Sequence, residues 1–203
     1  MKIAIIGHGN VGGALAKHWA NAGHQIIIGA RNVKDNKVQQ LAQGENISAT
    51  DIQLAAQEAE VILVATPAHI AVDLANQLGK LPGKIIIDAT NAVRQKPEPY
   101  KTAFHALQDI TGAELAKCFN STGYENMKNP VYSGEGIDMF VAGSSTKAKE
   151  IAMQLAKDAG FGACYDFGGD DRVELLEQFA LSWINLAIFQ GHGRNIAFKV
   201  LKR

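Results

Sequence analysis

The sequence has few cysteines, no net charge and no long apolar run, and each absence argues against a class of protein. Cys118 and Cys164 are the two cysteines among 203 residues, and they lie far apart without metal-ligand spacing. This argues against a disulfide framework and a metal site and fits the reducing cytoplasm. The longest nearly apolar run, Phe179 to Phe189, is shorter than the roughly 20 residues that span a bilayer. No membrane association is therefore expected.

The balance of charge points to a small-molecule partner. Twenty basic and twenty acidic residues cancel, so no global field draws the chain to nucleic acid or to an anionic membrane. The first ten residues run directly into an apolar stretch, without the basic leader and cleavage site of an export signal. We therefore expect a cytoplasmic protein that binds a small molecule.

Short β-branched runs alternate with segments of helical periodicity along the chain. The runs are too apolar to keep one face in water, which is typical of parallel strands covered on both faces. Strands are expected at residues 2–6, 25–28, 61–65, 84–88, 115–119, 137–142 and 163–167, with a short one near residue 47. Helices are expected at residues 11–22, 35–43, 51–58, 67–78, 146–159 and 171–190.

This alternation predicts an α/β protein with a doubly wound parallel-sheet Rossmann fold and a C-terminal helical extension. We place the Rossmann domain at residues 1–168 and the extension at residues 169–203, where the long final helix predicts a homodimer. A looser stretch, residues 91–100, separates the two groups of strands. The basic residues after the final helix, from Arg194 to Arg203, are interpreted as a solvated end.

A glycine-rich motif lies between the first predicted strand and the first predicted helix. It reads Gly7, His8, Gly9, Asn10, Val11 and Gly12. In this setting the first glycine permits a tight turn, the second lets the backbone approach a pyrophosphate, and the third lets helix and strand pack closely. The N–H groups at the start of the helix then attract the anion. The motif predicts a dinucleotide site.

The residues just past the second strand indicate which dinucleotide is bound. NAD sites usually place an acidic residue there, whereas NADP sites need cations for the added phosphate. No acidic residue occurs between Met1 and Lys34. We predict that Arg31 grips the phosphate, with Asn32 beside it and Lys34 or Lys37 adding charge. The predicted cofactor is NADP, bound as NADPH.

Several segments together resemble a known family. They read GHGNVGGALAKHWANAGHQIIIGARN, ATPAHIA, IIIDATNAV, CFNSTGYENM and MFVAG. They resemble the predicted dinucleotide-binding proteins related to NADP oxidoreductases that use the deazaflavin coenzyme F-420. The chain is more distantly similar to the reductase domains of six-transmembrane metalloreductases and to pyrroline carboxylate reductases, but it lacks the membrane helices and the large helical dimerisation domain of those proteins.

The resemblance implies a compact NADPH-binding domain that passes hydride directly to an acceptor stacked on the nicotinamide. Carried over residue by residue, it adds cofactor-binding candidates in three segments. These are Ala65, Thr66, Pro67 and His69; Ala89 and Asn91; and Asn120 and Thr122. Two have plain structural alternatives, because Thr66 suits a helix cap and Asn91 suits a turn.

Other polar patterns in the sequence give weaker evidence about function. Tyr124 and Lys128 match the YxxxK spacing of short-chain dehydrogenases, but the glycine loop does not have that family's spacing. His8, His18 and His24 lack a carboxylate or cysteine partner at ligand spacing, so no metal is predicted. No catalytic residue is assigned, and His69 or Tyr124 would supply a proton if the acceptor were a carbonyl or imine.

The sequence therefore predicts an NADPH-dependent oxidoreductase acting on a deazaflavin, flavin or similar small acceptor. Hydride transfer to such a ring requires alignment and exclusion of water more than a strong acid. The alternative is a non-catalytic NADPH-binding redox sensor.

Overall fold

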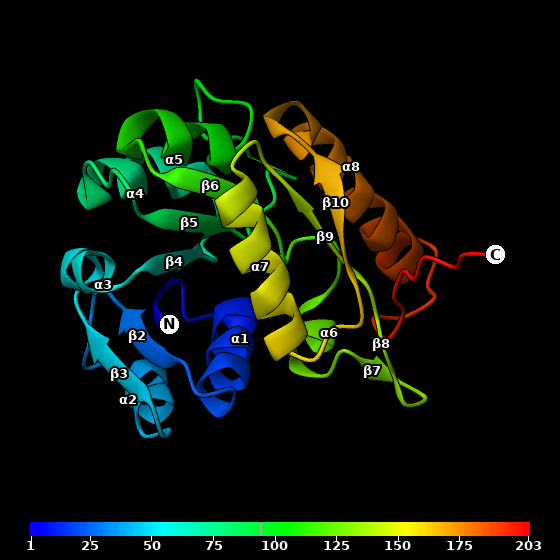
Figure 1. Cartoon of the computed structure of the whole chain (residues 1–203), viewed down its shortest axis with the longest axis horizontal. Helices are drawn as coiled ribbons and strands as arrows, with labels where there is room; N and C mark the ends of the chain where they lie inside the picture. Colours follow the sequence, from blue (N-terminus) through cyan, green and yellow to red (C-terminus); the bar gives the residue numbers. More distant parts are fainter. Residues whose placement is uncertain (94) are drawn as a thin grey trace.

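The computed structural model describes residues 1–93 and 95–203, which are organised around an eight-stranded sheet (Figure 1). The strands, in spatial order, are β10 (Cys164–Gly168), β9 (Met139–Ala142), β6 (Glu114–Lys117), β5 (Ile85–Asp88), β4 (Val61–Val64), β1 (Lys2–Ile6), β2 (Gln25–Gly29) and β3 (Ile47–Thr50). All neighbours from β6 to β3 are parallel. The predicted Rossmann fold is confirmed.

The last two strands depart from the predicted parallel arrangement. β9 pairs antiparallel with β6, and β10 is parallel to β9. Between β6 and β9 the chain forms the short helix α6 (Tyr124–Lys128) and a hairpin of β7 (Val131–Tyr132) and β8 (Glu135–Gly136). These short elements replace the crossover that a parallel strand would need. The chain therefore re-enters the sheet at the edge it left.

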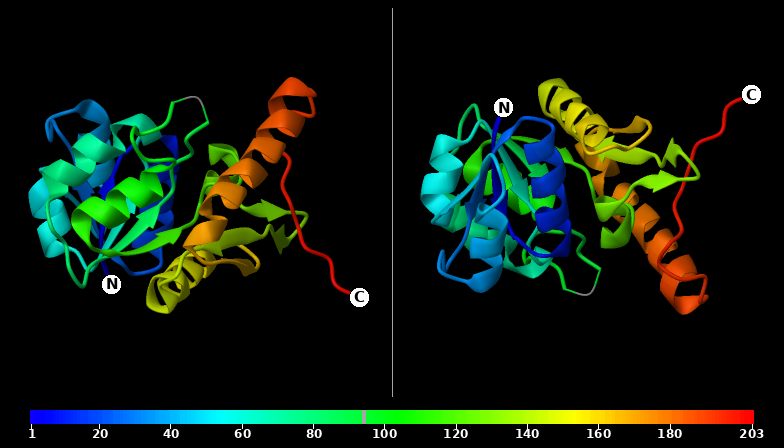
Figure 2. Two further views of the ribbon diagram at one scale, coloured as in Figure 1. Left: turned by 90° about the horizontal axis from the view of Figure 1, so that it is seen from above. Right: turned by 90° about the horizontal axis from the view of Figure 1, so that it is seen from below.

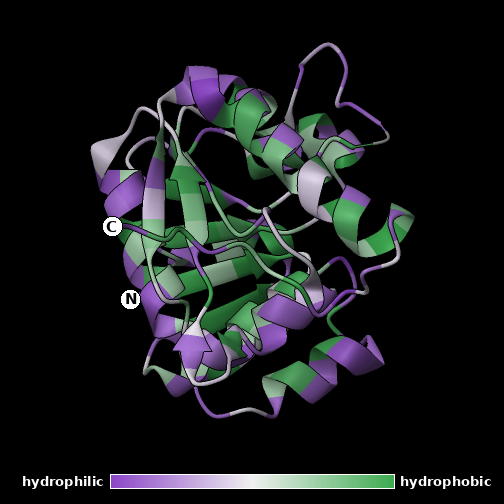
Figure 3. Cartoon of the chain, turned by 90° about the vertical axis from the view of Figure 1, so that its right-hand side faces the viewer, coloured by the Kyte–Doolittle hydropathy of each residue, from purple (hydrophilic) through white to green (hydrophobic). Residues whose placement is uncertain are grey.

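Helices cover both faces of the sheet. One layer holds α1 (Asn10–Asn21), α2 (Asn36–Ala42) and α7 (Thr146–Asp158); the other holds α3 (Ile52–Glu58), α4 (Ala71–Leu78), α5 (Ala103–Thr111) and α8 (Val173–Ile184). Along β1, Ile3 and Ile5 face the first layer, whereas Ala4 and Ile6 face the second. This alternation explains why the strands are apolar throughout, and Figure 3 shows the hydrophobic sheet between more polar helices.

The predicted final helix is confirmed, with irregular ends. It begins with a 3₁₀ turn, Asp170–Arg172, continues as α8 and ends in a π-helical turn, Asn185–Phe189. Val173 and Leu176 of α8 belong to the core of the second layer. Figure 2 shows α8 crossing the sheet obliquely, with the C-terminal tail returning beside it.

No helix in residues 1–93 or 95–203 combines the length and apolar character needed to cross a membrane. The division of the chain at residues 168 and 169 stays a prediction.

Candidate functional site

The glycine loop after β1 has two glycines that the fold requires and one that leaves space. Gly7 has φ +103°, and a Cβ there would lie 2.5 Å from the Ala65 carbonyl oxygen. A Cβ on Gly12 would lie 2.0 Å from the carbonyl oxygen of Gly7. At Gly9, which precedes α1 without a capping side chain, a Cβ would meet nothing within 4 Å. The open space and the uncapped helix start fit a phosphate group.

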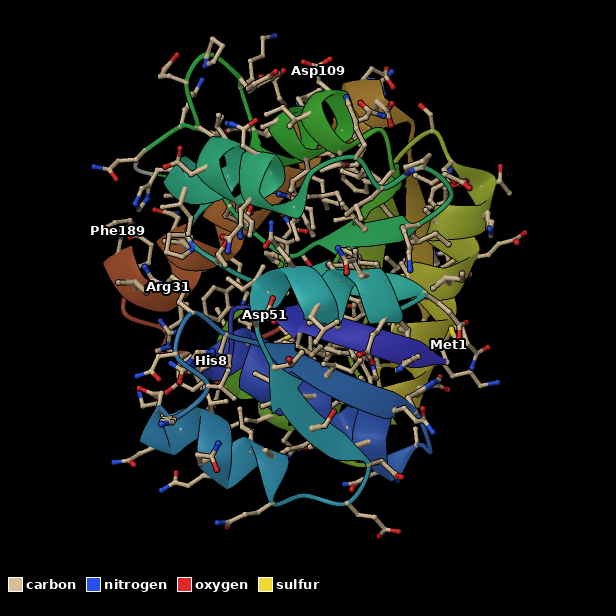
Figure 4. The ribbon with its side chains drawn as sticks, turned by 90° about the vertical axis from the view of Figure 1, so that its left-hand side faces the viewer. Met1, His8, Arg31, Asp51, Asp109 and Phe189 are labelled. Carbon is tan, nitrogen blue, oxygen red and sulfur yellow. The ribbon has the colours of Figure 1, made fainter. Side chains whose placement is uncertain are left out.

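A first cavity of about 450 Å³ lies at the carboxyl ends of β1, β2 and β4. The strand order reverses there, with β4 and β2 on opposite sides of β1, and open α/β sheets bind ligands at such points. The predicted residues that line it are Gly7, His8, Gly9, Arg31, Ala65, Thr66 and Pro67. Figure 4 shows His8 and Arg31 on the same side of the molecule, opposite Met1.

The charge of this first cavity comes from Arg31 and Lys37, with Asp73 of α4 as the acidic residue in its lining. Within residues 1–93 and 95–203, no ion pair engages Arg31. Lys37 reaches the cavity because Asp35 caps α2 at the Lys37 N–H, 2.8 Å away. Because no ion pair of the described residues engages it, the Arg31 guanidinium is available to an anionic ligand.

Five predicted site residues line neither this cavity nor the second one described below. They are Gly12, Asn32, Lys34, His69 and Ala89. Asn32 and Lys34 form a local turn, in which the Asn32 Oδ1 accepts the Lys34 N–H at 3.0 Å. The chain thus turns before α2, which brings Lys37 rather than Lys34 to the cavity.

Thr66 does not cap a helix. A 3₁₀ turn and then α4 follow Thr66, and their N-cap residues are Pro67 and Ile70. Neither N-terminus has a side-chain cap. The Thr66 Oγ1 is buried and has no hydrogen-bond partner in the described chain. The capping alternative is therefore wrong. Because buried hydroxyls are normally paired, the free hydroxyl is available to a ligand in the first cavity.

A second cavity, of about 390 Å³, adjoins the first through Ala65. The predicted residues in its lining are Asn10, Val11, Ala65, Asn91, Asn120 and Thr122. Its other wall is the apolar face of α8 and the π-helical turn, including Trp183, Ile184 and Ile188. The two cavities lie on either side of the start of α1.

The side-chain amides of Asn91 and Asn120 are paired with each other at this second cavity. Asn91 Nδ2 donates to the Asn120 carbonyl oxygen at 2.8 Å, and Asn120 Nδ2 donates to Asn91 Oδ1 at 2.9 Å. Asn91 thus bridges two strand ends rather than closing a turn. The Asn120 Oδ1 is buried without a partner, so it remains an acceptor for a ligand N–H.

A buried ion group beneath the cleft was not predicted. Lys117 Nζ donates to Asp88 Oδ2 at 2.9 Å and to Glu177 Oε1 at 2.6 Å. Burial alone would lower the pKa of Lys117, but the two carboxylates raise it above its usual value. The N–H groups of Thr90 and Ala92 donate to the remaining carboxylate oxygens. The group therefore holds the loop that carries Asn91.

The basic tail is not a solvated end at Arg194. Its guanidinium pairs with Glu125 and lies 5.4 Å from the centre of the Tyr124 ring. The hydrogen bond to Glu125 raises the pKa of Arg194. Arg194 also lines the second cavity. No local pattern indicates this contact, because the two residues of the pair are separated by 69 positions.

The fold and the site define a class, the Rossmann-fold NADP-dependent oxidoreductases. Residues 2–92 match the model of a family described as "NADP oxidoreductase coenzyme F420-dependent". Those residues are similar to that family, and the resemblance inferred from the sequence is confirmed.

Full-length relatives agree with the family match. The F420-dependent NADP reductase of Methanothermobacter marburgensis is 28% identical over 211 residues, covering 93% of each chain. That of Methanothermobacter thermautotrophicus is 29% identical, covering 98% of this chain and 94% of its own.

Two solved structures show the same fold. A putative F420-dependent NADP reductase from Arthrobacter superimposes with a TM-score of 0.85 at 24% identity, over the whole of both chains. A reductive aminase from Aspergillus terreus in complex with NADPH has a TM-score of 0.69 at 18% identity. This chain spans 62% of the length of that aminase.

Proposed function

We propose that this NADP-dependent oxidoreductase transfers hydride between NADP(H) and a deazaflavin, flavin or similar small acceptor. The observation that carries the proposal is the pair of adjoining cavities at the switch point of the sheet. One contains the glycine loop and Arg31, and the other is lined on one side by the apolar face of α8. The curated relatives named F420-dependent NADP reductase support a deazaflavin as the acceptor.

The residues of the first cavity fit NADPH, which when bound supplies the hydride. The open space at Gly9 and the N–H groups that begin α1 would hold the pyrophosphate. Arg31 and Lys37 would bind the 2′-phosphate, since both cations line this cavity. The unpartnered hydroxyl of Thr66 would donate to the cofactor.

The residues of the second cavity fit a flat acceptor. Trp183 and Ile184 form an apolar wall on one side of this cavity, which would keep water from the acceptor. Asn120 presents its free Oδ1 on the opposite side. Aligning two rings in this way requires no strong acid, which agrees with the lack of an acid–base pair in the described lining. For a carbonyl or imine acceptor, Tyr124 is the proton donor that lines the cavity, whereas His69 is exposed outside it.

The test is NADPH oxidation by the purified chain. It is mixed with NADPH and, separately, with a 5-deazaflavin, FMN, a quinone and a ferric chelate, and the loss of reduced-nicotinamide absorbance is followed. We expect oxidation with the deazaflavin or FMN, and slower oxidation of NADH than of NADPH. Tight NADPH binding without turnover on any acceptor would replace this proposal with the non-catalytic redox sensor.

We also infer a homodimer that forms through the end of the C-terminal helix. Leu186, Ile188 and Phe189 of the π-helical turn are exposed, Phe189 by 73%. Clustered apolar side chains of this kind are typical of an interface. Light scattering should give twice the 21.8 kDa of one chain, and a mass of one chain would contradict the inference.

We propose a cytoplasmic location on the state of the cysteines. Cys118 and Cys164 are free thiols, and burial raises the pKa of the Cys118 thiol. Neighbouring thiols that stay unlinked fit a reducing compartment. Alkylation of the protein in cells lysed directly into denaturant should label both, because Cys118 is buried in the folded protein; a linked pair would contradict this location.

A further inference from the structure

Arg194 is the one charged side chain in the lining of the second cavity, within residues 1–93 and 95–203. We propose that Arg194 selects the acceptor by binding an anionic substituent, a phosphate or carboxylate, carried by the ring that accepts hydride. This inference rests on the proposed function, because it takes the second cavity as the acceptor site. It adds that the acceptor is charged.

The guanidinium of Arg194 lies against two aromatic rings. Its central carbon lies 5.4 Å from the centre of the Tyr124 ring and 5.5 Å from that of Trp183. Such contacts are favourable for arginine and keep its planar fork in one orientation. The Trp183 ring is itself fixed, because its Nε1 donates to the Ile196 carbonyl oxygen at 2.7 Å. Arg194 is therefore preorganised rather than free in solvent.

The tail that carries Arg194 is also fixed to the body of the protein. The Ile196 carbonyl oxygen accepts a second bond, from Asn126 Nδ2 at 2.8 Å. Further along, the Val200 N–H donates to Asp138 Oδ2 at 2.7 Å. These bonds hold the backbone on the C-terminal side of Arg194, so its position at the cavity does not depend on the side chain alone.

Arg194 keeps donors available for a ligand. A guanidinium has five N–H groups, and one of them, on Nε, donates to Glu125 Oε1. Its other N–H groups make no hydrogen bond to any described residue, and its side chain is 42% exposed. Burial would raise the pKa of Glu125, but the bond from Arg194 lowers it. An incoming anion would therefore share the guanidinium with a charged carboxylate.

Two acceptors with the same ring test the proposal: 5-deazariboflavin and its 5′-phosphate. With saturating NADPH, we expect wild-type kcat/KM to be at least about tenfold higher for the phosphate, the size of one charged hydrogen bond. Arg194→Gln should bring the ratio close to one, because it should slow reduction of the phosphate more than reduction of the uncharged ring. Arg203→Gln is the matched control, since Arg203 is exposed outside both cavities, and should keep the wild-type ratio.

Glu125→Gln separates anion recognition from a purely structural ion pair. If Arg194 binds the acceptor, removing the competing carboxylate should raise the preference for the phosphate above wild type. If the pair only anchors the tail, both variants should impair both compounds alike. A wild-type ratio near one, an Arg194→Gln variant that keeps the ratio, or a fall with Glu125→Gln would overturn the proposal. Reduction of neither compound, with NADPH still bound, would instead overturn the proposed function.

Discussion

Lys117 and Asp88 form an ion pair with no solvent contact, in which the Nζ and Oδ2 atoms are 2.9 Å apart and both side chains are fully buried. Glu177 of α8 completes the group at 2.6 Å from the same amine. Three elements, β5, β6 and α8, therefore meet at one charge beneath the second cavity. This group sets both the position of α8 and the loop after β5, so the two sides of the cavity depend on it.

Lys117→Met should strongly destabilise the protein. It leaves the carboxylates of Asp88 and Glu177 buried without their cation, and breaking a buried pair in this way costs about 3–5 kcal/mol. Urea unfolding measures the loss. Lys101→Met is the control, because Lys101 pairs with Glu174 at an exposed site, where the expected change is below about 1 kcal/mol. Equal effects from the two substitutions would show that the buried group is not a major source of stability.

The same group predicts how wild-type stability depends on pH. The pKa of Lys117 is higher in the folded protein than its ordinary value of 10.5. A raised pKa means that the folded state binds the proton more tightly, so this contribution is fully present below pH 10.5 and is lost as pH rises through the folded value. Unfolding free energies measured from pH 8 upwards should therefore fall only at the alkaline end. Lys117→Met should lack this alkaline component.

Much of the fold could be predicted because it follows from local patterns. The strand β1 and the helix α7 come close to their expected bounds, since apolar runs and a 3.6-residue period are properties of neighbouring residues. The reversal of β9 could not be predicted in this way. It depends on α6 and a two-residue-strand hairpin, which are too short to leave a periodic signal.

The same distinction between local and long-range features applies to the candidate site. The glycine loop and Arg31 were predictable, because both follow strand ends directly in the sequence. Lys37 was named only as an alternative to Lys34, since the choice depends on where α2 begins. Arg194 and the Lys117 group were missed, because each is defined by partners at least 29 positions away.

Two glycines of the same loop should respond in opposite ways to alanine. Gly12→Ala places a Cβ 2.0 Å from the Gly7 carbonyl oxygen, so it should destabilise the protein by about 1–3 kcal/mol or more. Gly9→Ala meets no protein atom within 4 Å and should unfold close to the wild-type temperature. It should nevertheless weaken NADPH binding at least about tenfold, because the methyl group occupies the space for the pyrophosphate.

Thermal unfolding and NADPH titration of the two glycine variants provide the check. Normal NADPH binding by the Gly9→Ala variant would show that the pyrophosphate does not bind at this loop.

Arg31→Ala should weaken the binding of NADPH but hardly affect the binding of NADH. We expect NADPH binding to weaken by about 1.5–3 kcal/mol, the loss of a hydrogen bond to a charged group, with little change for NADH, which lacks the phosphate. Titration of both cofactors measures the difference. An unchanged preference for NADPH over NADH would show that Arg31 does not bind the phosphate.

Paired lysine variants sharpen the Arg31 test. Lys37 lines the first cavity and Lys34 does not, although both are exposed lysines three positions apart. Lys37→Ala should therefore reduce NADPH affinity more than Lys34→Ala does. The reverse order would mean that the phosphate binds to the turn before α2 instead.

Thr66→Val tests whether the unpartnered hydroxyl serves a ligand. Valine has nearly the same shape, and the Oγ1 that it removes has no hydrogen-bond partner in the described chain, so the free protein should keep its unfolding temperature or gain slightly. A helix cap would instead lose about 1 kcal/mol. NADPH binding should weaken by about 0.5–1.5 kcal/mol, the usual net value of one hydrogen bond. Thr66→Ser, which keeps the hydroxyl, should restore the affinity; equal affinity in the valine variant would show that the hydroxyl contacts no part of the cofactor.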